Sequence, residues 1–151
     1  MKLVEPDRDI RGDEWIADGD SFVSTTQRPS LIQFPYVLPS SYQIELTAER
    51  IGEPDGISLI LPLNGSMLWL QIDGWPQNGT LTGIDYIRGR RINRRRDQHV
   101  GRLIAIGKPT QIIANVVTDE GQISVTVDVG QKRVIDWEGR AVSLRQHGAD
   151  K

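Results

Sequence analysis

Two alternating apolar segments joined by Asn64-Gly65 constrain the fold of this chain more than any other feature. The segments are ISLILPL, residues 57–63, and SMLWLQIDG, residues 66–74. Both residues of a two-residue hairpin turn need positive φ, which Asn and Gly accept best, so this pattern predicts an antiparallel β-hairpin. Alternate residues of its second strand share a face, so we expect one face with Leu68, Leu70 and Ile72 and the other with Met67, Trp69, Gln71 and Asp73.

The same period of two recurs along the chain and predicts further strands. It is clearest in YQIELTA (42–48), TQIIANVVT (110–118), QISVTVDV (122–129) and KRVIDWEG (132–139). Glycine-containing turns separate the last three, which indicates an antiparallel meander. Shorter strands are expected in EWIADGDSFVST, where Gly19 turns a small hairpin, in SLIQF (30–34) and in AVSLRQ (141–146).

No segment has a sustained helical period, so the chain is predicted to be all-β, a sandwich or a barrel. With 151 residues and 38% apolar residues it has the size and composition of one domain, 1–151, with a loose tail at 147–151. The expected core between the sheets consists of Ile44, Leu46, Leu68, Leu70, Ile72, Ile123, Val125 and Val127.

Composition excludes several kinds of site. The chain has no cysteine and two histidines, so we expect no disulfide, no thiolate zinc site and no histidine-rich metal centre. Its acidic residues lack the ordered spacing of a calcium loop, and no cofactor is expected.

No apolar run approaches the roughly 20 residues of a membrane span, and the start lacks a secretion signal, so a soluble chain without membrane contact is predicted. The compartment stays open, since a domain of a longer exported protein would be extracytoplasmic.

The net charge of −2 hides an asymmetry. Residues 88–102 hold seven arginines and one acid, Asp97, a local charge of +6 that leaves about −8 for the rest. One interpretation is an exposed loop whose arginines pair with carboxylates of the body. Another is attraction of an acidic or sulphated ligand, to which Arg88 or Asn93 would contribute. An acidic pI near 5.7 and the single nearby aromatic, Tyr86, argue against a nucleic-acid partner.

The order of aromatic and strand segments resembles the concanavalin A-like lectin and glucanase superfamily, especially the laminin G-like domains of bacterial multidomain proteins. The segments are GDEWIADGDSFVS, FPYVLPSSYQIELTAER, GISLILPLNGSMLWLQIDGW and SVTVDVGQKRVIDWEG, and the similarity covers about Gly12 to Leu144. The resemblance implies an antiparallel two-sheet jelly-roll sandwich whose concave groove often holds sugars. It also places the strands with Glu45, Thr47, Trp69, Gln71 and Asp73 in one sheet. Fold does not fix function, because the relatives include lectins, glycosidases and adhesion modules.

A glycosidase would need two carboxyl groups about 5 to 9 Å apart. The hydrolases of the superfamily usually carry them in a Glu-x-Asp-x-x-Glu run, which this chain lacks. Glu45 and Asp73 are the pair that neighbouring strands would bring together. A glycoside or keto-disaccharide hydrolase therefore stays an alternative, and a ligand-free structural or protein-interaction domain is another.

The favoured interpretation is a non-catalytic carbohydrate-binding or interaction module. A tryptophan would stack on a sugar ring while carboxylate, amide and guanidinium groups bind its hydroxyls. The predicted ligand-facing rim consists of Trp69, Gln71, Asp73, Trp75, Tyr86 and Arg88. In the competing interpretation Trp75 closes the end of the sandwich and Asp73 caps the turn at Gly74. Trp15 and Trp137 are assigned to packing. A protein partner or a second copy of the chain is also compatible with the sequence, which identifies neither ligand nor oligomeric state.

Overall fold

The computed structural model describes residues 4–11, 15–24, 31–52, 56–63 and 65–144. The chain divides into two compact units, residues 1–37 and 38–151, and each is described by itself. The expected tail at 147–151 lies outside the described residues. The single domain over 1–151 stays a prediction.

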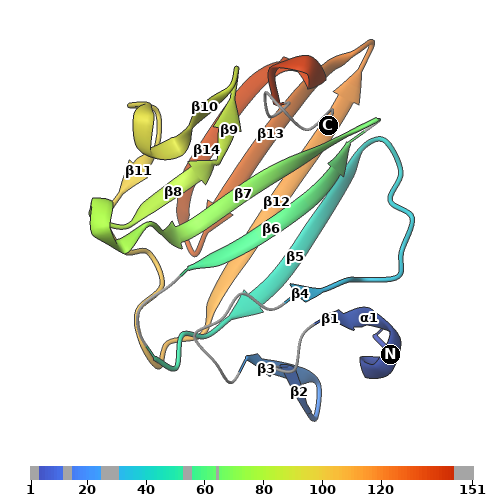
Figure 1. The fold of residues 1–151 in the computed structure, drawn as a ribbon, viewed down its shortest axis with the longest axis vertical. Coiled ribbons are helices and arrows are strands. Elements are labelled where there is room, and N and C mark those ends of the chain that lie inside the picture. The colour runs from blue at the N-terminus through green and yellow to red at the C-terminus, as the bar shows by residue number, and fades with distance from the viewer. Residues whose placement is uncertain (1–3, 12–14, 25–30, 53–55, 64, 145–151) are drawn as a thin grey trace. The chain divides into compact units, whose positions relative to one another are not determined.

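The N-terminal unit consists of short elements (Figure 1). They are α1 (Pro6–Asp9), β1 (Ile10–Arg11), β2 (Trp15–Asp18), β3 (Ser21–Ser24) and β4 (Leu31–Ile32). β1 pairs with β4 and β2 pairs with β3, both antiparallel. Gly19 connects β2 to β3 with a φ of 59°, which confirms the predicted small hairpin. The strand predicted over 30–34 is limited to the two residues of β4.

The C-terminal unit is built from two four-stranded antiparallel sheets. The first sheet has the order β11 (His99–Val100), β8 (Leu81–Ile84), β7 (Ser66–Gly74) and β6 (Ile57–Leu63). The second has the order β14 (Lys132–Arg140), β13 (Gln122–Val129), β12 (Thr110–Asp119) and β5 (Tyr42–Ala48). A small hairpin, β9 (Tyr86–Ile87) and β10 (Arg90–Arg91), and the 3-10 turns η1 (Pro76–Asn78), η2 (Ile92–Arg94) and η3 (Ala141–Leu144) complete the unit.

The two sheets share one hydrophobic core, which confirms the all-β class and the antiparallel pairing. In β13 every second residue from Ile123 to Val129 is buried, as the alternation predicts. Six of the eight expected core residues are at most 3% exposed: Leu68, Leu70, Ile72, Ile123, Val125 and Val127. Ile44 and Leu46 are partly buried and pack against this cluster.

The hairpin expected around residue 64 is confirmed, because Leu63 pairs directly with Ser66. Gly65 has the positive φ, 70°, that a two-residue turn requires. Asn64 itself lies outside the described residues. The strand expected in AVSLRQ is wrong where it is described: Ala141–Leu144 form the turn η3, which brings Leu144 into the core at 4% exposure.

The expectation that Glu45 and Trp69 belong to one sheet is also wrong. The chain crosses between the sheets after β5, so β5 pairs with β12 while β6 pairs with β7. Glu45 and Thr47 therefore lie in the second sheet, and Trp69 and Gln71 lie in the first. Alternation shows which face a side chain occupies, but it does not show which strand is the neighbour.

One hydrogen bond joins the edge strands of the two sheets. β5 and β6 are edge strands of the sheets as described. The Tyr42 hydroxyl donates to the carbonyl oxygen of Pro62 at 2.7 Å. Burial raises the pKa of Tyr42 to about 12, so this phenol stays protonated and able to donate.

Candidate functional site

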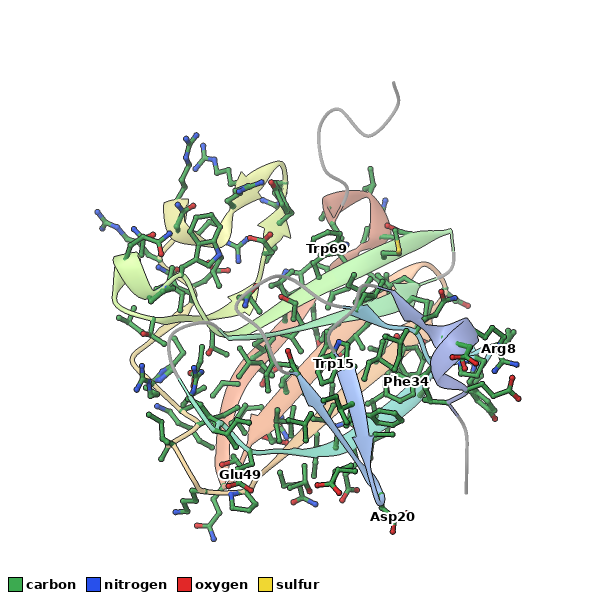
Figure 2. All side chains as sticks on the ribbon, turned by 60° about the horizontal axis from the view of Figure 1, so that its bottom comes forward. Arg8, Trp15, Asp20, Phe34, Glu49 and Trp69 are labelled. Carbon is green, nitrogen blue, oxygen red and sulfur yellow. The ribbon has the colours of Figure 1, made fainter. Side chains whose placement is uncertain are left out.

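The outward face of the first sheet exposes a row of large apolar side chains. Ile60 lies opposite Trp69, and Pro62 lies opposite Met67. Ile60 is 38% exposed, Trp69 41% and Met67 56%. Figure 2 labels Trp69 on β7. The predicted exposed position of Trp69 is therefore what the structure shows, and this surface is named the Trp69 face.

Two polar side chains accompany Trp69 on this face. Gln71 is half-buried and lies opposite Ser58, whose hydroxyl donates to its amide oxygen at 2.9 Å. On the other side, the backbone N–H of Asp85 donates to the carbonyl oxygen of Trp69 at 2.7 Å. This bond continues the register Leu70–Ile84 by one position, so Asp85 stands opposite Trp69 and on the same face.

Asp85 is the residue that the sequence reasoning missed. The sequence signal that could have identified it is its position two residues after Gly83, because alternate residues of a strand share a face. Burial raises the pKa of the Asp85 carboxyl, while Arg91, a hydrogen bond from the backbone of Ile92, and Arg95 act in the opposite direction. Its Oδ1 has no hydrogen-bond partner among the described residues. This oxygen has almost no exposed surface, so it is an unsatisfied acceptor inside the protein and not part of the exposed face.

Trp75 and Tyr86 lie near each other, as expected. Arg91, which was not among the predicted site residues, contacts both rings. The Arg91 guanidinium carbon lies 5.6 Å from the centroid of Trp75 and 5.1 Å from that of Tyr86. Arg91 Nε also donates to the Tyr86 hydroxyl. Both distances are typical of cation–π contacts. Arg88 is exposed, its φ is 51°, and its backbone N–H donates to the carbonyl oxygen of Ser143 at 2.6 Å.

Asp73 lies inside the protein and not on the predicted rim. It is 1% exposed, and its carboxylate accepts hydrogen bonds of 2.8 Å from the backbone N–H groups of Leu103 and Ile104. Arg50 lies 3.4 Å from the same carboxylate. The reason is local: the β7–β8 register shifts between Gln71 and Gly74, and Asp73 has a φ of 54°. This irregularity turns the side chain inward and breaks the alternation.

The carboxylate pair proposed for a hydrolase therefore does not form. Glu45 is exposed on the second sheet, where it accepts a hydrogen bond from Gln111. Asp73 is buried in the first sheet and held by Arg50. The two carboxylates do not face a common surface.

In the arginine-rich segment, residues 88–102, the side chain of Arg95 forms hydrogen bonds that hold the segment in place. Arg95 donates to the carbonyl oxygens of Ile84 at 2.6 Å and Arg90 at 3.1 Å, and it pairs with Asp97 at 2.8 Å. Its side chain is only 10% exposed. Ile92 is fully buried and packs above Gly83, where a Cβ would lie 3.0 Å from Ile92 Cδ1. Ile92 and Arg95 thus hold the segment against β8, while Arg88, Arg90, Arg91, Arg94 and Arg96 are exposed, as expected of this loop.

No family model, curated protein or solved structure matches this chain. Within the described part of the chain, no helix is long and apolar enough to cross a membrane. The described residues also contain no cluster of three or more histidine, aspartate or glutamate side chains that could hold a metal ion.

Proposed function

We propose that this protein is a non-catalytic carbohydrate-binding module and that the sugar binds on the Trp69 face. The observation that carries the proposal is the exposed Trp69 ring, which has the half-buried Gln71 amide on the same face of β7. A sugar has an apolar C–H face and a rim of hydroxyls. It is therefore recognised by an aromatic surface beside a few polar groups.

Each side chain has a distinct part in this proposal. The Trp69 ring packs against the apolar face of the sugar, and the Gln71 side chain binds a hydroxyl. The amide nitrogen of Gln71 donates to no described residue, so it can donate to this hydroxyl. The stacked Trp75, Arg91 and Tyr86 side chains provide the next group of polar and aromatic contacts along the chain.

We further propose that the fold is a concanavalin A-like jelly roll of the laminin G-like kind. Two four-stranded antiparallel sheets around one core support this proposal. Sugar binding on a sheet face is also a property that the resemblance implies. A protein partner or a second copy of the chain would be compatible with the same exposed face.

The hydrolase alternative is the second candidate. Burial raises the pKa of the Asp85 carboxyl, the direction that a general acid requires, but the Glu45–Asp73 pair that the chemistry would use does not form. A hydrolase would turn over a glycoside or keto-glycoside, and Asp85→Asn would abolish that turnover while leaving the fold intact. Absence of turnover together with binding supports the non-catalytic module.

The test is a broad glycan array followed by calorimetric titration of the best ligand. Trp69→Ala should weaken binding by about 1 to 3 kcal/mol, the range of an aromatic hot spot. Met67→Ala is the matched control, because Met67 is exposed on the same face but has no aromatic ring. A flat array would contradict the proposal, and so would an equal loss in both variants. A flat array combined with binding to another protein chain would support the interaction-domain alternative.

A further inference from the structure

A second surface of the C-terminal unit is hollowed, and Trp69 is not among the residues that line it. It is an open depression of about 730 Å³ between the β9–β10 hairpin and the end of β14. Figure 1 shows this hairpin beside β14 and η3. The volume is within the range of small-molecule sites, about 300 to 1,000 Å³. It is lined by Ile87, Arg88, Arg90, Arg95, Arg96, Asp97, Trp137, Glu138, Gly139 and Ser143.

The hairpin separates this depression from the stacked aromatic residues. Arg91 pairs with Tyr86, and Arg90 pairs with Ile87. Residues opposite each other share a face, and adjacent residues of a strand take opposite faces. Tyr86 and Arg91 therefore occupy the face with Trp75, whereas Ile87 and Arg90 occupy the other face and line the depression. The two surfaces are distinct.

The lining is predominantly cationic, with four arginines against Asp97 and Glu138. Arg95 and Asp97 pair with each other, and Arg95 also binds two backbone carbonyls, so this pair forms a fixed wall. The side chains of Arg88, Arg90 and Arg96 are exposed, and no described residue forms an ion pair with them. They are thus available for an anion.

One residue that lines the depression, Trp137, is aromatic. Trp137 is half-buried, and its ring lies across Gly139, where a Cβ would be 2.4 Å from the ring atom Cζ2. Glycine at 139 is therefore required for this ring position. The hydrogen bond from the backbone of Arg88 to Ser143 ties the rim of the depression to η3. Contacts within the protein therefore fix the Trp137 ring and the Arg88 backbone beside the depression.

We propose that this depression binds a small organic oxyanion, a phosphate or sulphate ester on a ring. The planar guanidinium groups of Arg88, Arg90 and Arg96 match the paired oxygens of such a group. The ring would contact Trp137 and Ile87. A cation is disfavoured by the excess of arginines.

The test uses calorimetric titration of the full chain with phenyl phosphate, phenyl sulphate, inorganic phosphate, inorganic sulphate and phenol. The phenyl esters should bind more tightly than the inorganic ions, and phenol should not bind. Comparison of the two esters distinguishes a phosphate from a sulphate source. The double variant Arg90→Gln, Arg96→Gln should weaken ester binding about tenfold or more, a loss of about 1.4 kcal/mol or more.

Two controls separate a built site from general charge attraction. Arg94→Gln removes an exposed arginine of the same segment that does not line the depression, so it should change the affinity by less than about twofold. Gly139→Ala displaces the Trp137 ring, so it should weaken the phenyl esters but not the inorganic ions. Trp69→Ala should leave ester binding unchanged, which keeps this test independent of the proposed sugar site.

Three results would overturn the proposal. The first is no saturable binding of either ester to the unchanged protein. The second is a loss of ester affinity per removed charge that is equal in Arg94→Gln and in the double variant. Such a result would show only a general electrostatic attraction. The third is an equal affinity of the protein for the phenyl esters and the inorganic ions. Such a result would show that the phenyl ring does not contact Trp137.

Discussion

At the scale of single residues, two aspartates of the first sheet show how backbone geometry decides the role of a carboxylate. Asp73 has a positive φ, points inward and holds Leu103, Ile104 and Arg50. Asp85 continues the regular register opposite Trp69 and keeps one oxygen without a partner among the described residues. The first carboxylate stabilises the fold through these bonds, and the second leaves one buried oxygen without a hydrogen bond.

Replacing Asp73 by asparagine should therefore destabilise the protein strongly. The variant removes the carboxylate charge that faces buried Arg50 and turns one oxygen acceptor into a donor facing backbone N–H groups. Loss of one partner of a buried ion pair costs about 3 to 5 kcal/mol. Urea unfolding measures the change. Asp128→Asn, which removes an exposed pair with Arg133, should cost at most about 1 kcal/mol. Similar losses in both variants would contradict a special role for Asp73.

At the scale of elements, strand β7 connects the core to the candidate site through its two faces. Leu70 is 1% exposed on the core face, and Met67 is 56% exposed on the Trp69 face. Leu70→Ala should cost about 2 to 5 kcal/mol because it opens a cavity. Met67→Ala should change the free energy of unfolding by less than about 0.5 kcal/mol. Denaturant unfolding of both variants checks the register, and a small effect of Leu70→Ala would show that the assigned faces are wrong.

The same elements show how far the sequence predicts the structure. Alternation correctly separated Leu70 from Trp69, because a period of two follows from strand geometry itself. It could not show that β5 pairs with β12, since partner choice depends on contacts distant in sequence. It also could not place Asp73, because the local shift in register moves one side chain without changing the composition. Arg91 was missed because its position between two rings depends on the β9–β10 pairing.

At the scale of the whole molecule, the division into two units leads to a prediction about independent folding. Within the described part of the chain, all residues of the hydrophobic core cluster lie between Tyr42 and Leu144. A fragment of residues 38–151 should therefore keep a β-type circular dichroism spectrum and a cooperative unfolding transition. Thermal unfolding of the fragment and of the full chain provides the measurement. A fragment without a cooperative transition would show that residues 1–37 belong to the same folding unit.

The hydrogen bond between Tyr42 and Pro62 also has a consequence for self-association. An edge strand such as β6 offers unpaired N–H and C=O groups on which a second chain can build an intermolecular sheet. At Pro62, near the end of β6, the backbone has no N–H to donate, and its carbonyl oxygen is already hydrogen-bonded to the Tyr42 hydroxyl. This local block works against growth of fibrils along an otherwise apolar strand.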